Sequence, residues 1–269
     1  MNNLHRELAP ISDAAWAQIE EEASRTLKRH LAARRVVDVA GPKGLELAAV
    51  GTGHRHHIQA PGEGIQAAQR AAKALVELRV PFELARQAID DVERGAKDSD
   101  WSALKEAAKK IAFAEDRSVF DGYDAAGIQG IRQGSSNPAL TLPSNARGYP
   151  GVVAQAVSQL RLAGVNGPYA LVLGAEAYTA ASGRSDEGYP VFDHIERVVD
   201  GGIIWAPAIE GAFVVTTRSG DFELDIGQDI SIGYQSHSST VVALYLQETF
   251  TFRLLTTEAA VVLAPGEKK

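Results

Sequence analysis

The sequence predicts an α+β fold, because helical and strand patterns concentrate in different parts of the chain. Apolar residues at helical spacing dominate the first two thirds of the 269 residues. Short apolar runs separated by turn residues dominate the region after Gly202. Residues 41–64, which follow the predicted N-terminal helix, contain eight Gly and Pro residues. This composition predicts an extended segment rather than part of a packed core. Helices followed by strands are typical of the α+β class.

The composition is that of a globular protein and excludes several functions. Hydrophobic residues make up 45% of the chain, charged residues 23%, and the net charge is −7. An acidic chain is a poor general nucleic-acid binder. The absence of Cys excludes disulfides, thiolate metal sites and a Cys nucleophile. With no long apolar window and no apolar signal core in residues 1–10, we expect a cytoplasmic protein with no membrane partner and no nucleic-acid partner.

The first element is an amphipathic helix that begins after Ser12 or Asp13 and ends near residues 34–35. Its apolar stripe consists of Trp16, Ile19, Ala23, Leu27 and Leu31. The Gly-rich region that follows predicts an arm like a long hairpin, with strands at 45–50 and 75–80. Such an arm cannot bury itself, so it needs a partner surface, and the simplest partner is another copy of the chain.

The remaining elements follow in order along the chain. Helices are predicted at 84–94, 101–120, 152–163, 175–181 and 191–199, with a loop at 122–150 and a buried strand at 169–173. Strands are predicted at 203–209, 212–217, 222–226, 230–234, 240–256 and 259–263. The strand at 240–256 is unusually long.

No standard catalytic motif is present: the sequence lacks a GxxxxGK phosphate loop, an HExxH zinc motif and a GxSxG nucleophile elbow. The densest polar cluster is His54, His56 and His57, whose imidazoles are possible ligands of a divalent metal. We favour a solvated loop or a subunit contact, because no carboxylate lies close in sequence and Arg55 opposes cation binding.

Two further polar groups are interpreted as structural. Asp90, Asp91 and Glu93 are possible metal ligands, but pairing with Arg86, Arg94 or a neighbouring subunit is favoured. Ser185, Asp193 and His194 contain the residue types of a nucleophile triad, yet nothing in the sequence fixes their geometry.

Charge is distributed unevenly along the chain. The first helix ends in a basic stretch formed by Arg25, Lys28, Arg29, Arg34 and Arg35. This stretch either complements the helix dipole or contacts RNA, an acidic partner or an apolar peptide segment. Residues 184–229 contain ten Asp and Glu residues but only three Arg residues. This acidic segment either favours the passage of cations through a pore or forms a solvent-exposed surface without a specific function.

Several short segments together carry a family resemblance. They include residues 34–39, 90–95, 113–117, 136–140, 203–208, 220–222, 227–234 and 244–250, along with the N-terminal residues 1–4 and 8–11. In this order, and over nearly the whole chain, they resemble encapsulins of the linocin type. The resemblance implies the tailed-phage major-capsid-protein fold. It further implies a protein that self-assembles into an icosahedral nanocompartment of about sixty copies, with T=1 symmetry.

The resemblance also implies a domain division and a set of partners. The peripheral domain comprises residues 1–48, 77–124 and 216–269, the extended loop 49–76, and the axial domain 125–215. The shell encloses cargo enzymes that are recruited by C-terminal targeting peptides. The expected cargo is a dye-decolourising peroxidase, with a ferritin-like protein as the second choice.

Two sites follow from the resemblance. The cargo-peptide groove comprises Leu27, Leu31, Arg34, Asp38 and Ile230. Relatives often have Phe at position 27, and Leu27 gives the pocket a smaller apolar area than Phe would. The five-fold pore loop comprises Arg184, Ser185, Asp186, Glu187 and Gly188, and its two acids favour the passage of cations.

No cofactor, metal or catalytic residue is predicted, and the chain is not expected to be an enzyme. Flavin is not expected, because Gln87 stands where a flavin-binding relative has Trp. The alternatives are a hydrolase or bacteriocin-like activity, which requires a nucleophile or metal site, and a viral capsid protein that packages nucleic acid, which favours a basic interior.

Overall fold

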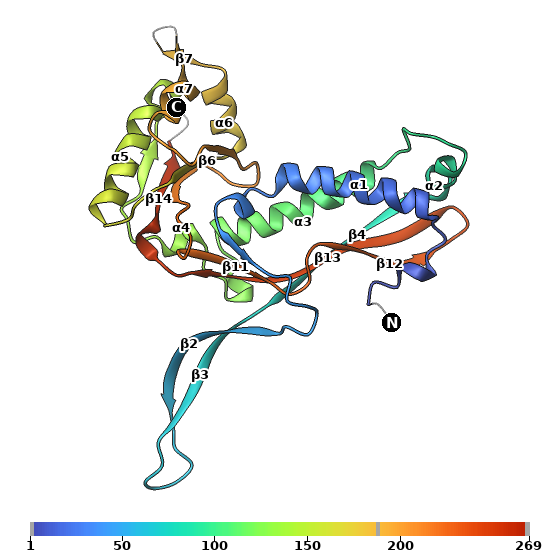
Figure 1. Cartoon of the computed structure of the whole chain (residues 1–269), viewed down its shortest axis with the longest axis horizontal. Helices are drawn as coiled ribbons and strands as arrows, with labels where there is room; N and C mark the ends of the chain where they lie inside the picture. Colours follow the sequence, from blue (N-terminus) through green and yellow to red (C-terminus); the bar gives the residue numbers. More distant parts are fainter. Residues whose placement is uncertain (1–2, 187–188, 267–269) are drawn as a thin grey trace.

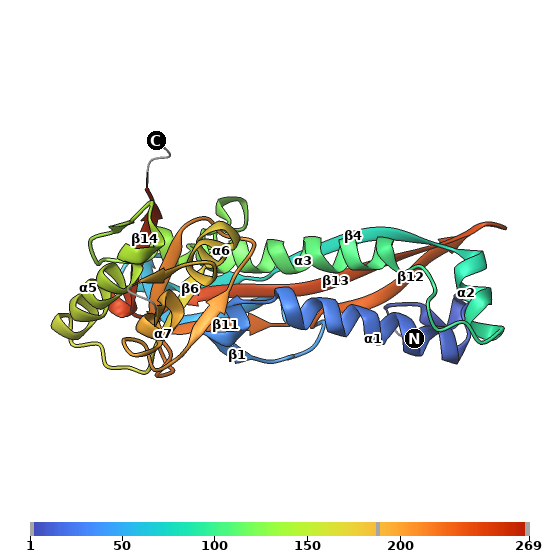
Figure 2. The same ribbon diagram turned by 90° about the horizontal axis from the view of Figure 1, so that it is seen from above.

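The computed structural model describes residues 3–186 and 189–266, and it has three parts (Figure 1). An elongated body consists of long strands covered by two helices. A lobe of helices and short strands lies at one end of the body, and a two-stranded arm projects from the body (Figure 1). Viewed from above, α1 and α3 run along the body beside its strands (Figure 2). The fold is α+β, as predicted.

The body contains the first helices of the chain. They are α1 (Asp13–His30), α2 (Arg86–Glu93) and α3 (Ser102–Phe120). Ser12 caps α1 by accepting a hydrogen bond from the backbone N–H of Ala15. Among the described residues, no helix is long and apolar enough to cross a membrane.

The body sheet is built around one long strand. Its members are β1 (Asp38–Ala40), β4 (Val76–Ala85), β11 (Phe222–Ile226), β12 (Ser231–His237) and β13 (Val241–Leu254). The strand β13 pairs with β4 along one edge and with β11 and then β12 along the other. The predicted long strand is therefore confirmed, and its length lets it join three partners.

The helices α1 and α3 bury their apolar stripes against this sheet. The buried side chains of this core come from both helices and from the sheet. They are Ala15, Trp16, Ile19 and Ala23 of α1, Leu104, Ala107, Ala108 and Ile111 of α3, and Phe82, Leu84, Ile232, Val242, Leu244 and Leu246 of the sheet. The burial of these side chains from water is the main force that fixes the helices to the sheet.

The lobe has a sheet of its own. Its strand order is β5 (Leu140–Leu142), β14 (Ala260–Pro265), β10 (Ala212–Thr216), β6 (Tyr169–Leu173) and β9 (Ile203–Trp205). The lobe helices are α4 (Ile131–Gly134), α5 (Tyr149–Leu162), α6 (Ala175–Ser182) and α7 (Val191–Glu196), and the short hairpin is β7 (Ser185–Asp186) with β8 (Tyr189–Pro190). Every residue of β6 and β10 is buried, as expected for central strands.

The structure differs from the sequence prediction in the lobe. The last strand, β14, pairs with β10 and β5 in the lobe sheet, whereas residues 216–269 were all assigned to the peripheral domain. Residues 122–150 were predicted to be a loop, but they contain α4 and β5, which are too short to show a period. The predicted strand at 203–209 is only the three residues of β9.

The arm is a hairpin of β2 (Ala49–Ile58) and β3 (Ala67–Ala74) that pairs with no other strand in the described part of the chain. An extended arm was predicted here, but the assignment of strands was wrong. Residues 75–80 do not return along the arm; most of them belong to β4, which pairs with β13 in the body. The alternation in this segment reflects the half-buried face of β4.

Candidate functional site

A groove of about 350 Å³ lies between α1 and β12. One wall is the face of α1 that carries Ala23 and Leu27, followed by Leu31 where the helix ends. The other wall is formed by Ile230, Ile232 and Leu246, with Leu4 from the N-terminal segment. The spacing of three and four residues along α1 brings its members to one side of the helix, which is why they share the groove.

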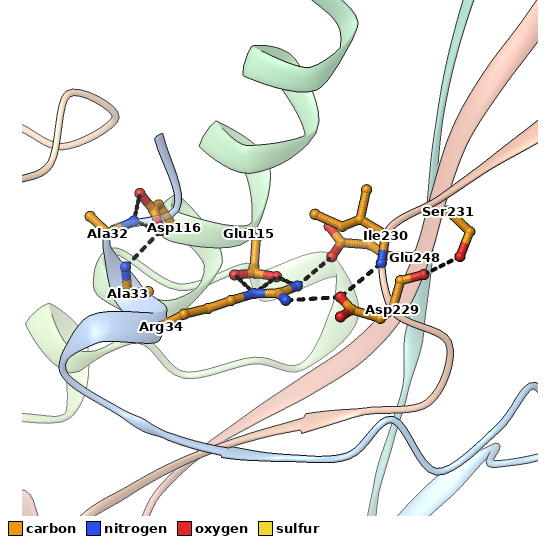
Figure 3. Close-up of polar contacts among 9 residues, drawn as sticks. All are labelled: Ala32, Ala33, Arg34, Glu115, Asp116, Asp229, Ile230, Ser231 and Glu248. Atoms are coloured by element: carbon orange, nitrogen blue, oxygen red, sulfur yellow. Dashed lines mark hydrogen bonds and ion pairs between the residues drawn. The ribbon is translucent and has the colours of Figure 1, made fainter. Parts of the chain in front are cut away.

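The guanidinium of Arg34 lies at one end of the groove and binds three carboxylates (Figure 3). Its Nε donates to the two carboxylate oxygens of Glu115 at 2.9 and 3.0 Å, and Nη1 donates to Oδ1 of Asp229 at 2.8 Å. Nη2 lies 3.6 Å from Oε2 of Glu248. One cation thus connects α3, the start of β12 and β13.

One carboxyl group of this cluster favours its protonated form. Glu115 and Glu248 have almost no exposed side-chain surface, whereas Asp229 is 46% exposed. Burial, and then the charge of Glu115, raises the pKa of Glu248 well above its usual range. Neither oxygen of Glu248 accepts a hydrogen bond from a described residue, so the neutral acid, which can donate toward Glu115, is the favoured form.

Asp116 fixes the end of α1. Its carboxylate accepts the backbone N–H of Ala32 at 3.0 and 3.1 Å and that of Ala33 at 2.9 Å. Burial nevertheless raises the pKa of Asp116 to about 7. The helix was predicted to continue to residues 34–35, but it ends at His30, and a 3-10 turn, η2 (Ala33–Arg35), follows. This turn directs Arg34 toward the sheet (Figure 3).

Four of the five predicted groove residues lie together. Leu27, Leu31, Arg34 and Ile230 all line the groove. Asp38 does not: it lies in β1, its carboxylate accepts the backbone N–H of Gly220 at 2.6 Å, and it lines a separate depression. Asp38 therefore does not line this groove, because β1 pairs with β11 beside the C-terminal part of β13, whereas β12 pairs with the N-terminal part of β13.

The acidic partners of Arg34, and Ile232 and Leu246 in the sheet wall of the groove, were not predicted from the sequence. A signal for Glu248 was present, because Gln247, Glu248 and Thr249 interrupt a long apolar strand pattern. All three are buried. Buried polar residues in the middle of a strand require partners, which points to a polar cluster beneath the helix layer.

The described part of the predicted pore loop, residues 184–186, lies at the tip of the lobe (Figure 1). Ser185 and Asp186 form β7, which pairs with β8. Arg184, which is exposed, immediately precedes this hairpin. Glu187 and Gly188 lie outside the described residues.

The other polar candidates do not assemble into a site in the part of the chain that the structure describes. His54, His56 and His57 are exposed on β2, where His56 contacts Gln69 through Nε2 and Oε1 at 3.0 Å. Within residues 3–186 and 189–266, no group of three side chains is placed to hold a metal ion.

Of the acidic residues of α2, Asp91 makes one of the arginine pairings that were favoured, whereas Glu93 has a different partner. Asp91 forms an ion pair with Arg94, and Glu93 accepts a hydrogen bond from the hydroxyl of Ser12. Ser185 lies in β7 and Asp193 and His194 in α7, and no hydrogen bond joins these three among the described residues.

Comparisons with known proteins agree on one family. A family model described as "encapsulating protein for peroxidase" matches residues 1–251. The chain is 61% identical to a type 1 encapsulin shell protein of Mycobacterium tuberculosis, over 98% of this chain and 100% of the relative. The virus-like particle of Pyrococcus furiosus matches with a TM-score of 0.63 at 17% identity, over 92% of this chain and 98% of the other. Gordonia phage Cozz matches with a TM-score of 0.56 at 13% identity, over 89% and 87%. The likeness to these two structures establishes the tailed-phage capsid fold.

Replacing Arg34 should destabilise the protein strongly. In Arg34→Met, the buried Glu115 and Glu248 lose their cation, so we expect the free energy of unfolding to fall by about 3–5 kcal/mol. Chemical denaturation of variant and wild type at matched concentration measures the change. Arg25→Met is the control, because its ion pairs with Glu21 and Glu22 are exposed and contribute at most about 1 kcal/mol. Equal losses in the two variants would contradict the role of the cluster.

The raised pKa of Asp116 should make stability fall as pH rises. The folded protein binds this proton more tightly than the unfolded chain, so the contribution to stability is complete below the unfolded value of 3.8 and is lost through about pH 7. In Asp116→Asn this part of the dependence should vanish. Denaturation at a series of pH values between about 5 and 8 gives the two slopes. Parallel profiles would show that Asp116 does not titrate in this window.

Proposed function

The chain belongs to the family of type 1 encapsulin shell proteins, and we propose that its shell recruits a cargo enzyme through the groove between α1 and β12. The protein is a self-assembling shell subunit. The observation that carries the cargo proposal is the groove itself: of the residues expected to bind a targeting peptide, Leu27, Leu31 and Ile230 line one groove together with the fixed cation of Arg34.

Exposed apolar residues on the arm support assembly through contacts between copies. Ile58 and Ile65 lie near the arm tip and are 49% and 53% exposed. The arm has no core of its own, and exposed apolar surface of this kind is buried by a partner. We propose a closed shell of about sixty copies, which gives a mass of about 1.7 MDa from chains of 28.7 kDa. In this shell the body would be the peripheral domain and the lobe the axial domain.

A peroxidase is the proposed cargo, because the matching family is described as encapsulating one. We propose the dye-decolourising class, with a ferritin-like protein as the second candidate, in a cytoplasmic compartment. The groove suits the apolar residues of a peptide better than a folded protein surface, because it is narrow. The relatives are named as shell proteins, which supports a structural rather than catalytic role.

A charge placed in the groove should abolish cargo loading but not assembly. In Leu27→Asp, burying cargo side chains would also bury a carboxylate, so loading should fall by about tenfold or more. The shell is co-expressed with a dye-decolourising peroxidase, and the particle mass and co-purified enzyme are measured. Ala17→Asp places the same charge on α1 outside the groove and should load normally. Small oligomers in place of particles would contradict the shell, and equal loading of all variants would contradict the groove.

The pore loop is also a proposal, which rests on its acidic sequence and its place at the lobe tip. We propose that Asp186 and Glu187 favour cations at the five-fold opening. In the double variant Asp186→Asn/Glu187→Gln, the ratio of cation to anion entry should fall by about tenfold. Entry of small charged tracers into empty shells measures the ratio. Asp193→Asn, an exposed acid on α7, is the control. An unchanged ratio in the double variant would refute the proposal.

A further inference from the structure

We propose that the lobe binds a small organic acid in two adjoining cavities, one polar and one apolar. The polar cavity measures about 430 Å³ and is lined by Arg147 and Arg184. The apolar cavity measures about 220 Å³ and is lined by residues of β5, α5, α6 and β14. The cargo groove lies in the body between α1 and β12, so this site is separate from it.

The two cavities meet at Ser144 and Ala180, each of which lines both of them. Ser144 follows β5 in the chain, and Ala180 lies on α6. Both side chains are small, so the boundary contains no bulky group at these positions. A ligand that spans the boundary would place one end in each cavity. Sites for small molecules commonly combine apolar walls with a few polar groups that fix the orientation of the ligand.

The polar cavity presents two guanidinium groups without a counter-ion from the described chain. Arg147 lies in the 3-10 turn η4 (Ala146–Gly148), Arg184 follows α6, and both residues are exposed. Neither guanidinium forms an ion pair or a hydrogen bond with a described residue. Two like charges that line one cavity repel each other, and an oxyanion bound between them would attract both. Guanidinium groups match the planar carboxylate and bind it through paired hydrogen bonds.

Tyr149 adds a hydrogen-bond donor to the apolar cavity. The residue lines this cavity and is only 4% exposed. Its hydroxyl forms no hydrogen bond with a described residue. Burial raises the pKa of the Tyr149 hydroxyl, so the group stays protonated and able to donate at neutral pH. Buried tyrosine hydroxyls usually have a partner, and a ligand oxygen in the apolar cavity would supply one.

The lining of the apolar cavity favours a ligand end without charge. Its apolar wall includes Leu142, Pro143, Ala177 and Pro265. Glu176, in the first turn of α6, also lines this cavity and is exposed. Its carboxylate would repel a second acid group on the ligand. The ligand class is therefore a monocarboxylic acid with an apolar skeleton, whose carboxylate lies in the polar cavity.

The first test titrates octanoate into assembled, cargo-free wild-type shells and measures binding by isothermal titration calorimetry. Octanoate should bind about tenfold or more tightly than acetate, which lacks the apolar chain, and than octanol, which lacks the charge. The dicarboxylate suberate should bind more weakly than octanoate, because its second carboxylate would lie near Glu176. Equal affinities for octanoate and acetate, or for octanoate and octanol, would overturn the proposed ligand class.

Arginine variants test the polar cavity, and the particle mass shows that each variant assembles. In Arg147→Gln and in Arg184→Gln, the affinity for octanoate should fall by about tenfold, because each change removes one charged donor. Arg197→Gln is the matched control: Arg197 is an exposed arginine of the lobe that lines neither cavity, and this variant should bind like wild type. Equal binding by all variants overturns the site. Failure of octanoate to bind wild-type shells, which is expected if a neighbouring copy occupies both arginines, overturns it as well.

The role of Tyr149 is tested with oxo-octanoates that carry a ketone at C3, C5 or C7. At least one of these acids should bind about fivefold more tightly than octanoate, because its ketone accepts the hydroxyl of Tyr149. Tyr149→Phe should abolish that gain and leave the binding of octanoate unchanged. A gain that persists in Tyr149→Phe, or no gain with any of the acids, would overturn this role. The titrations use shells without cargo, so their failure would leave the proposed cargo groove standing.

Discussion

The ion cluster around Arg34 is the interaction on which the arrangement of the groove depends. The guanidinium binds Glu115 of α3, Asp229 at the start of β12 and Glu248 of β13. It therefore holds the helix layer and two strands at a fixed separation. Because two of the three carboxylates are buried, loss of the cation would leave them without compensation, and burial raises the pKa of Glu248 well above its usual range.

The second constraint is the length of β13. Its pairing with β4 on one side and with β11 and β12 on the other makes the body a single stiff sheet. The chain then continues from β13 into β14, which belongs to the lobe sheet. The body sheet and the lobe sheet are therefore connected by a short segment of the chain.

A free strand edge is a hazard in a protein that accumulates at high local concentration, because edges pair with other chains. Here the edge of β12 is recessed beside α1, and Leu4 covers part of it. This recess limits edge-to-edge pairing with other chains.

Local patterns in the sequence determined most of the elements and their class. The period of Trp16, Ile19 and Ala23 predicted α1, and the apolar run at 169–173 predicted β6 to the residue. The family resemblance placed Leu27, Leu31, Arg34 and Ile230 in one site, which the structure brings together. These features could be predicted because they depend on neighbours in sequence or on motifs that remain intact.

Only the tertiary structure decided the rest, because it depends on contacts between distant segments. The end of α1 is set by Asp116, more than eighty positions away, which binds the N–H groups of Ala32 and Ala33. The pairing of residues 76–80 with β13, rather than along the arm, depends on which face is buried. The partners of Arg34 come from α3, β13 and the segment before β12, which only the tertiary structure brings together and which local periodicity does not encode.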